Sequence, residues 1–102
     1  MEQNGKNGLR MGLPGSAFRI TVYTTDPCGR CLQVKDLLRR HDLEFEEVNL
    51  AKDPVGRAAL VECTGQMTFP QIIVDDRPIG GLQELEDAER EGRLALLIAP
   101  VG

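Results

Sequence analysis

The sequence predicts a single α/β domain built on a four-stranded mixed sheet that is flanked by three or more helices. β-Rich segments alternate with segments of helical periodicity, in the order β-α-β, then α, then β-β-α. A chain of 102 residues is long enough for one domain and too short for two. Trp is absent and aromatic residues make up only 4%, so aliphatic side chains must build the core.

The first half of the chain predicts a strand–helix–strand unit. Residues 18–23 alternate apolar and polar side chains, as a half-buried strand does. Asp26 and Pro27 predict the N-cap and the first position of a helix. Residues 45–50 form the next short β-rich segment. Because a helix joins the two strands, we expect them to run parallel with a right-handed crossover. The apolar side chains at helical spacing are Cys31, Val34, Leu37 and Leu38.

The second half predicts a helix, a hairpin and a final helix. Asp53 and Pro54 open the first of these helices and Gly65 ends it. Residues 71–74 and 77–79 are two short strands around an Asp-Asp turn, which predicts an antiparallel hairpin. After Gly80 and Gly81, residues 82–99 have helical character, either continuous or interrupted at Gly92.

Composition limits the environment and the partners. Residues 1–16 are aperiodic and glycine-rich, so we expect a flexible tail before a domain at 17–102. The net charge of −4 argues against nucleic acid. No apolar run approaches the roughly 18 residues of a membrane span, and no secretory signal is recognisable. Three cysteines are an odd number, which favours a reducing compartment and a cytoplasmic location.

Cys28 and Cys31 lie where the first strand passes into the first helix. The N–H groups and dipole of a helix N-terminus stabilise a thiolate, so we expect a lowered pKa for the Cys28 thiol. Arg30 favours the thiolate, whereas Asp26 opposes it. Cys31 lies one turn further along the helix and can resolve a mixed disulfide on Cys28. The motif and the order of elements are typical of a thioredoxin-like fold.

Other roles for the cysteines stay open. The pair could form an inert disulfide, or it could bind zinc if His41 and Cys63 supplied further ligands. His41 lies near the far end of the first helix, which disfavours zinc. Cys63 shares an apolar stripe with Leu60, which predicts a core thiol; a regulatory or second exchange site is the alternative.

Two further segments predict a binding groove. Thr68, Phe69 and Pro70 precede the third strand, where a cis proline would leave the preceding backbone open to an extended substrate. An ordinary proline at the start of a strand is the alternative. Gly80 and Gly81 precede a helix whose N-terminus would suit a carboxylate, although a plain turn has the same residues.

From about residue 19 to 98 the chain resembles the glutaredoxins, whose fold is thioredoxin-like. Cys-x-x-Cys alone occurs in both glutaredoxins and thioredoxins, and the Gly-Gly pair after the hairpin is the feature that distinguishes the glutaredoxins. The matching residues are Val22-Tyr23-Thr24, Cys28 with Cys31, Thr68-Phe69-Pro70-Gln71, and Ile79-Gly80-Gly81 followed by Leu85.

The resemblance implies a glutathione-dependent disulfide oxidoreductase that reduces protein disulfides or glutathione mixed disulfides. Cys28 would be the nucleophile that accepts glutathione, and Cys31 the resolving thiol. The implied partners are glutathione or another low-molecular-weight thiol, together with oxidised proteins, and the implied state is a monomer. The implied glutathione site comprises Arg30, Thr68, Phe69, Pro70, Gly81, Leu82 and Gln83.

The chain also departs from the family pattern. Gly29 and Arg30 stand where Pro-Tyr is common, and Thr25 replaces a frequent Lys, for which Arg30 is the candidate substitute. Gln83 replaces an acidic residue or Ser. Some relatives with Gly after the nucleophile carry a [2Fe–2S] cluster in a glutathione-bridged dimer, with Cys28 as the equivalent protein ligand. This second function ranks below disulfide exchange because the Trp-Pro insertion typical of single-cysteine relatives is absent.

Overall fold

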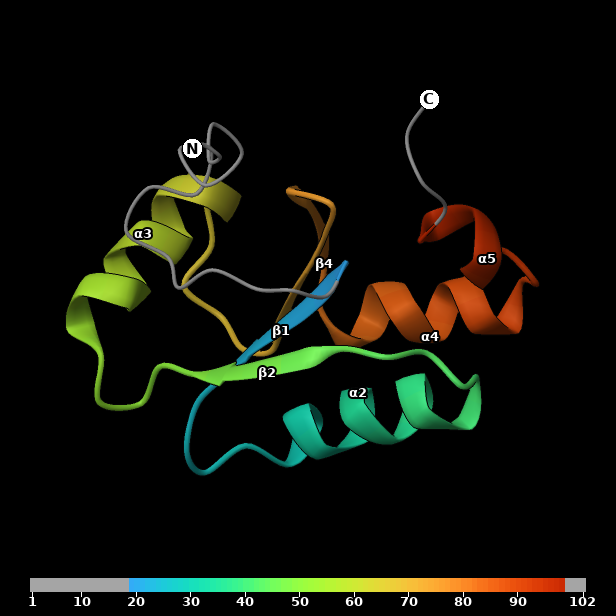
Figure 1. The fold of residues 1–102 in the computed structure, drawn as a ribbon, viewed down its shortest axis with the longest axis horizontal. Helices are drawn as coiled ribbons and strands as arrows, with labels where there is room; N and C mark the ends of the chain where they lie inside the picture. The colour runs from blue at the N-terminus through green and yellow to red at the C-terminus, as the bar shows by residue number, and fades with distance from the viewer. Residues whose placement is uncertain (1–18, 99–102) are drawn as a thin grey trace.

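The computed structural model describes residues 19–98, which form one four-stranded mixed sheet with helices on both faces (Figure 1). The strand order is β2-β1-β3-β4, with β1 and β2 parallel and the other two pairs antiparallel. The predicted tail at 1–16 lies outside the described residues. The strands are β1 (Ile20–Thr24), β2 (Glu46–Asn49), β3 (Gln71–Val74) and β4 (Arg77–Gly80).

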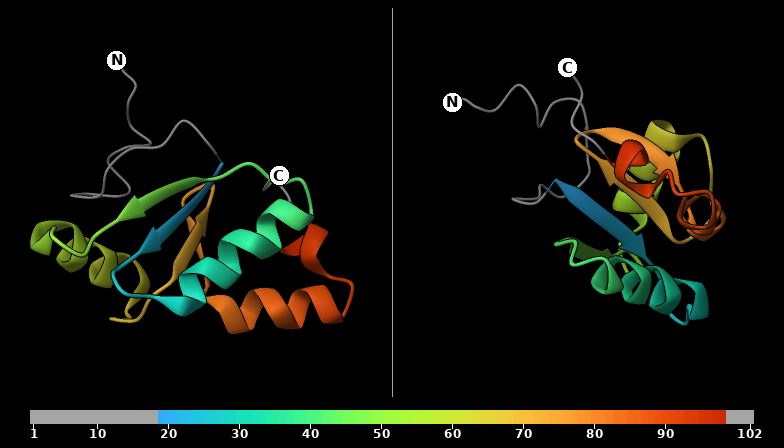
Figure 2. Two further views of the ribbon diagram at one scale, coloured as in Figure 1. Left: turned by 90° about the horizontal axis from the view of Figure 1, so that it is seen from below. Right: turned by 90° about the vertical axis from the view of Figure 1, so that its right-hand side faces the viewer.

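The helices divide between the two faces of the sheet. Figure 2 shows α3 on one side and α2 with α4 on the other. The predicted final helix is interrupted, because the chain turns at Gly92 with a φ of 73°. Among the described residues, no helix is long and apolar enough to span a membrane. The helices are α2 (Gly29–Arg40), α3 (Pro54–Thr64), α4 (Leu82–Arg90) and α5 (Leu94–Leu97).

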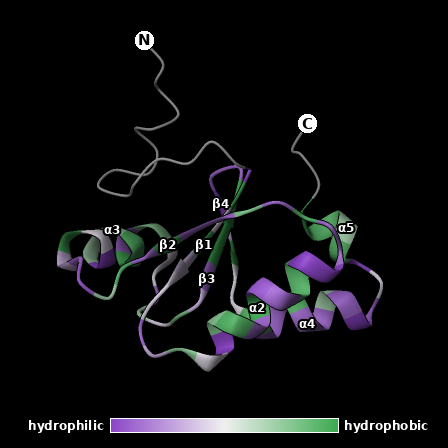
Figure 3. Ribbon diagram, turned by 60° about the horizontal axis from the view of Figure 1, so that its bottom comes forward, coloured by the Kyte–Doolittle hydropathy of each residue, from purple (hydrophilic) through white to green (hydrophobic). Residues whose placement is uncertain are grey.

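The sheet separates two apolar clusters, because successive strand residues point to opposite faces. On the face covered by α2 and α4, Val22 and Ile72 pack against Leu37 and Leu85, all at most 1% exposed. On the opposite face, Tyr23 and Ile73 pack with Leu50 and Leu60. Figure 3 shows apolar and polar residues alternating around α2 and α4, as expected for helices with one buried face.

The start of α3 agrees with the prediction. Asp53 is the N-cap, and its Oδ1 accepts the N–H of Gly56 at 2.8 Å. Pro54 occupies the first turn, where a missing N–H costs nothing. Gly65 ends the helix with a φ of 74°, a conformation that favours glycine.

The predicted start of the first helix was wrong by two residues. Asp26 and Pro27 precede α2 as part of the connecting loop, joined by a cis peptide bond. Cys28 is the N-cap instead, and its Sγ accepts the N–H of Cys31 at 3.1 Å. A side chain that supplies the capping acceptor fixes the helix boundary, so the helix begins at Gly29.

Candidate active site

The two cysteines of the motif form a disulfide at the start of α2, with their Cα atoms 5.3 Å apart. Cys31 is 3% exposed and packs beneath the helix end. Cys28 is half-buried at the cap position, so its sulfur is the more accessible of the two. This arrangement suits an outer attacking sulfur and an inner resolving sulfur, as predicted.

The surroundings of the pair favour negative charge on Cys28. The first turn of α2 contains no acidic residue, and Arg30 is exposed within it. Unpaired N–H groups at a helix start carry partial positive charge. Asp26 lies in the preceding loop and is exposed to solvent, which weakens its opposing effect.

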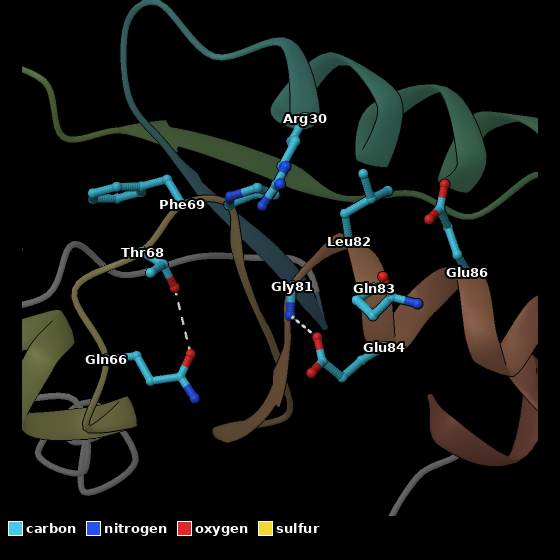
Figure 4. Close-up of a pocket in the computed structure, with 10 residues that line it drawn as sticks. Arg30, Gln66, Thr68, Phe69, Gly81, Leu82, Gln83, Glu84 and Glu86 are labelled. Carbon is cyan, nitrogen blue, oxygen red and sulfur yellow. Dashed lines mark hydrogen bonds between the residues drawn. The ribbon is translucent and has the colours of Figure 1, made fainter.

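A pocket of about 380 Å³ lies beside the start of α2 (Figure 4). Its walls come from three segments: the first turn of α2, the loop before β3, and the start of α4. All seven residues of the predicted glutathione site line this pocket. The lining residues are Arg30, Gln66, Thr68, Phe69, Pro70, Gly81, Leu82, Gln83, Glu84 and Glu86.

The loop before β3 and the Gly-Gly turn touch each other. The Phe69–Pro70 peptide bond is cis, and Pro70 is buried. A Cβ atom placed on Gly81 would lie 2.8 Å from the carbonyl oxygen of Pro70. Only glycine permits this approach, so the contact fixes two walls of the pocket relative to each other.

The start of α4 is partly capped by its own side chain. The N–H of Gly81 donates to Glu84 Oε1 at 2.7 Å, shown as a dashed line in Figure 4. Gly80 has a φ of 108°, a conformation that only glycine adopts readily. The charged residues that line the pocket are Arg30, Glu84 and Glu86, and one oxygen of Glu84 is already bonded to the Gly81 N–H.

Three lining residues were not among the predicted site residues. Gln66 lies in a loop without a motif of its own, and Glu86 belongs to an acidic run that resembles a solvated helix face. Glu84 follows Gly81 by three residues, which is the spacing of a capping box. That spacing was the one sequence signal that could have pointed to any of these three residues.

The other cysteine lies elsewhere. Cys63 is half-buried and packs against the cluster that contains Tyr23 and Leu60, as expected of a core thiol. In the part of the chain that the structure describes, no three His, Cys, Asp or Glu side chains are grouped to hold a metal ion. His41, a ligand that the zinc alternative would need, instead bonds to Glu89 at 2.7 Å through its Nε2. The iron–sulfur alternative, with Cys28 as ligand, stays a prediction.

Comparisons with known proteins agree with this geometry. The family model for glutaredoxin matches residues 20–79. A glutaredoxin of Pseudomonas aeruginosa is 35% identical over 80 residues, which are 78% of this chain and 95% of the relative.

Solved structures agree as well. The glutaredoxin of Brucella melitensis is 38% identical with a TM-score of 0.69, covering 83% of this chain and 92% of that one. A buckwheat glutaredoxin–glutathione complex shares the fold at 24% identity and a TM-score of 0.73, covering 91% and 82%. The chain therefore belongs to the glutaredoxin family and is a thiol–disulfide oxidoreductase.

Proposed function

We propose that Cys28 attacks glutathione mixed disulfides and protein disulfides, and that glutathione occupies the pocket beside α2. The observation that carries this proposal is the position of the cysteine pair. The outer sulfur caps a helix whose first turn also supplies one wall of the pocket. Chemistry at the sulfur and binding in the pocket can therefore serve the same molecule.

The reaction balances without a further cofactor. The Cys28 thiolate attacks the glutathione sulfur of a mixed disulfide, which forms a Cys28–glutathione bond and releases the protein as a thiolate that takes up a proton. A second glutathione thiolate then attacks that bond, releases glutathione disulfide and restores the Cys28 thiolate. With a protein disulfide, Cys31 attacks the intermediate instead and leaves the Cys28–Cys31 disulfide. Glutathione then reduces that disulfide.

The charged groups of glutathione can be assigned to separate parts of the pocket. The tripeptide carries two carboxylates and one ammonium at neutral pH, and the residues that line the pocket include one arginine and two glutamates. We assign the glycine carboxylate to Arg30, and the γ-glutamyl carboxylate to the backbone N–H groups of Leu82 and Gln83 at the start of α4. The Glu84 and Glu86 carboxylates are left to face the ammonium. The glutathione complex of the buckwheat relative supports this choice of ligand.

The loop before β3 supplies the remaining wall. We assign the backbone of Thr68 to pair with the cysteine of an extended tripeptide, and Phe69 and Pro70 to line its other side. Another low-molecular-weight thiol with the same backbone would fit the same contacts. We further propose a monomer in the cytoplasm, which gel filtration and fluorescence microscopy of a tagged chain would test.

Two variants test the catalytic assignment. Cys28→Ser should lose all turnover with a glutathionylated peptide and with a protein disulfide. Cys31→Ser should keep the first activity and lose the second, because only the second needs a resolving thiol. Cys63→Ser is the control: Cys63 is half-buried, packs against the cluster that contains Tyr23 and Leu60, and does not line the pocket, so the change should not affect either rate.

Mass spectrometry gives an independent readout. After treatment with glutathione disulfide, the Cys31→Ser variant should gain about 305 Da on Cys28. The unaltered protein should instead close the Cys28–Cys31 bond. Full activity in Cys28→Ser, or an adduct on Cys63 alone, would contradict the assignment.

A further inference from the structure

We infer that Gln71 is a positioning residue, whose side-chain amide holds the loop before β3 in the shape that the proposed glutathione site needs. The inference rests on the proposed function for its catalytic consequence. The anchoring of the loop itself can be measured without any assay of activity.

Gln71 is an unusual residue for its place in the sheet. It is 2% exposed, and the other residues of β3 are the apolar and buried Ile72, Ile73 and Val74. A buried amide is costly unless its hydrogen-bonding groups find partners. An aliphatic residue would fill the same place without that requirement, so the contacts of the amide are the informative feature.

The amide of Gln71 bonds to two residues of the pocket wall. Its Nε2 donates to Thr68 Oγ1 at 2.8 Å and to Gln66 Oε1 at 3.2 Å. The Thr68 hydroxyl donates in turn to Gln66 Oε1 at 3.4 Å, drawn as a dashed line in Figure 4. The three side chains thus form a closed triangle, and two of its corners line the pocket.

The triangle connects an exposed loop to a rigid strand. Gln66 and Thr68 are exposed, whereas Gln71 lies opposite Tyr23 in the ladder between β3 and β1. Beyond the triangle, the Pro70 carbonyl touches the Gly81 turn. The loop is therefore held from the sheet on one side and from the start of α4 on the other.

Loss of the amide should change the loop more than the fold. Gln71→Met keeps the length of the side chain and removes its hydrogen-bonding groups. The two oxygen atoms that lose the Gln71 donor, Gln66 Oε1 and Thr68 Oγ1, belong to exposed residues, so water can replace the lost hydrogen bonds. We expect KM for a glutathionylated peptide to rise about threefold to tenfold, with kcat within about twofold. Cys28 would keep its environment, so the pH profile of its alkylation rate should not move.

The experiment combines kinetics with hydrogen exchange in the oxidised full-length protein. In Gln71→Met, the amides of residues 66–69 should exchange faster than in the unaltered chain, while those of β1 should not. Thr21→Val is the matched control: it also replaces a buried polar side chain of the sheet, 1% exposed, but at a position that pairs with Glu46 and Ile73 rather than with Gln71. It should leave both KM and the loop amides unchanged.

A second set of variants breaks the triangle from its exposed corners. Gln66→Ala and Thr68→Val do not touch the core, and each should speed loop exchange in the same way. In a double variant with Gln71→Met, each loop substitution should speed loop exchange by less than it does alone, because Gln71→Met has already removed a bond that the loop substitution removes. These variants keep the inference testable if Gln71→Met fails to fold.

The outcomes separate the two proposals. Unchanged loop exchange in Gln71→Met, or in both loop variants, would overturn the anchoring role. A fall in kcat together with a shifted alkylation profile would also overturn it, because Gln71 would then act at the sulfur. If the unaltered protein does not turn over glutathionylated peptide, the proposed function fails. Faster loop exchange would still support the anchor.

Discussion

Gly81→Ala tests whether the contact between the two loops shapes the pocket. The added Cβ would lie 2.8 Å from the Pro70 carbonyl oxygen, where ordinary contact begins at 3.4 Å. The obstructing atom is a backbone carbonyl oxygen, which cannot rotate away as a side chain can, so the two loops must separate by about 0.6 Å. The φ of −122° at Gly81 suits any residue, so the effect comes from the contact alone. Overpacking of this kind typically costs about 1–3 kcal/mol of stability.

The functional loss should exceed the loss of stability. A displacement of about 1 Å in the groups that position a substrate can cost roughly a hundredfold even when the mutation is far from the chemistry, so a shift of about 0.6 Å should lower kcat/KM by about tenfold. The assay is reduction of a glutathionylated peptide at a temperature where urea titration shows the variant to be fully folded. Most of the loss should appear in KM, because the cysteine pair is not touched.

Gly56→Ala provides the matched control. Its Cβ would lie 2.6 Å from Asp53 Oδ2 and 2.8 Å from Leu50 Cδ2, so it also crowds a buried position. The position is in α3, away from the residues that line the pocket. We expect reduced stability with unchanged kcat/KM. Equal activity losses in the two variants would refute the reasoning, as would a Gly81→Ala protein with full activity.

Two further predictions concern stability. Lys35 donates to Glu47 at 2.8 Å, and this bond lowers the pKa of Glu47 despite partial burial, which opposes it. Because the pKa of Glu47 is lower in the folded protein, its ionised carboxylate stabilises the fold above the ordinary carboxyl pKa, and this stabilisation is lost as the pH falls through the folded pKa. The free energy of unfolding should therefore exceed that of Glu47→Gln by less than about 1 kcal/mol at pH 7, and the difference should vanish on acidification. A pH-independent difference in urea titrations would contradict this. Asp53→Ala removes the acceptor for the Gly56 N–H and should cost about 1 kcal/mol; an unchanged urea midpoint would show that the cap contributes nothing.

The elements of the fold were predictable where their signals are local. The Asp53-Pro54 start and the Gly65 end of α3 lie within a few residues of the backbone groups that they satisfy. The hairpin of β3 and β4 is similarly encoded by an Asp-Asp turn, whose residues both have positive φ. Even so, the cap of α2 was misplaced, because Asp26-Pro27 has the usual sequence of a helix start, whereas cysteine is not among the residues preferred at an N-cap.

The site was predictable only where a motif marks it. The Cys28–Cys31 pair, the Pro70 loop and the Gly81 turn are recognisable in sequence, and all but the cysteines line the pocket. Gln66 was not recognisable, because its place depends on the path of a loop and on a bond from Gln71. Contacts between segments distant in sequence, such as Gly81 with the Pro70 carbonyl, need coordinates.

The corrected start of α2 has a chemical consequence. With Asp26 as the cap, a carboxylate would have taken the N–H donors at the helix end, and the sulfur would have lain inside the first turn. In the structure the sulfur itself accepts the Cys31 N–H, so the attacking atom occupies the position where a helix favours negative charge. Serine is among the preferred N-cap residues. Cys28→Ser therefore removes the nucleophile while keeping the cap, and loss of turnover in that variant reports on the sulfur rather than on a frayed helix.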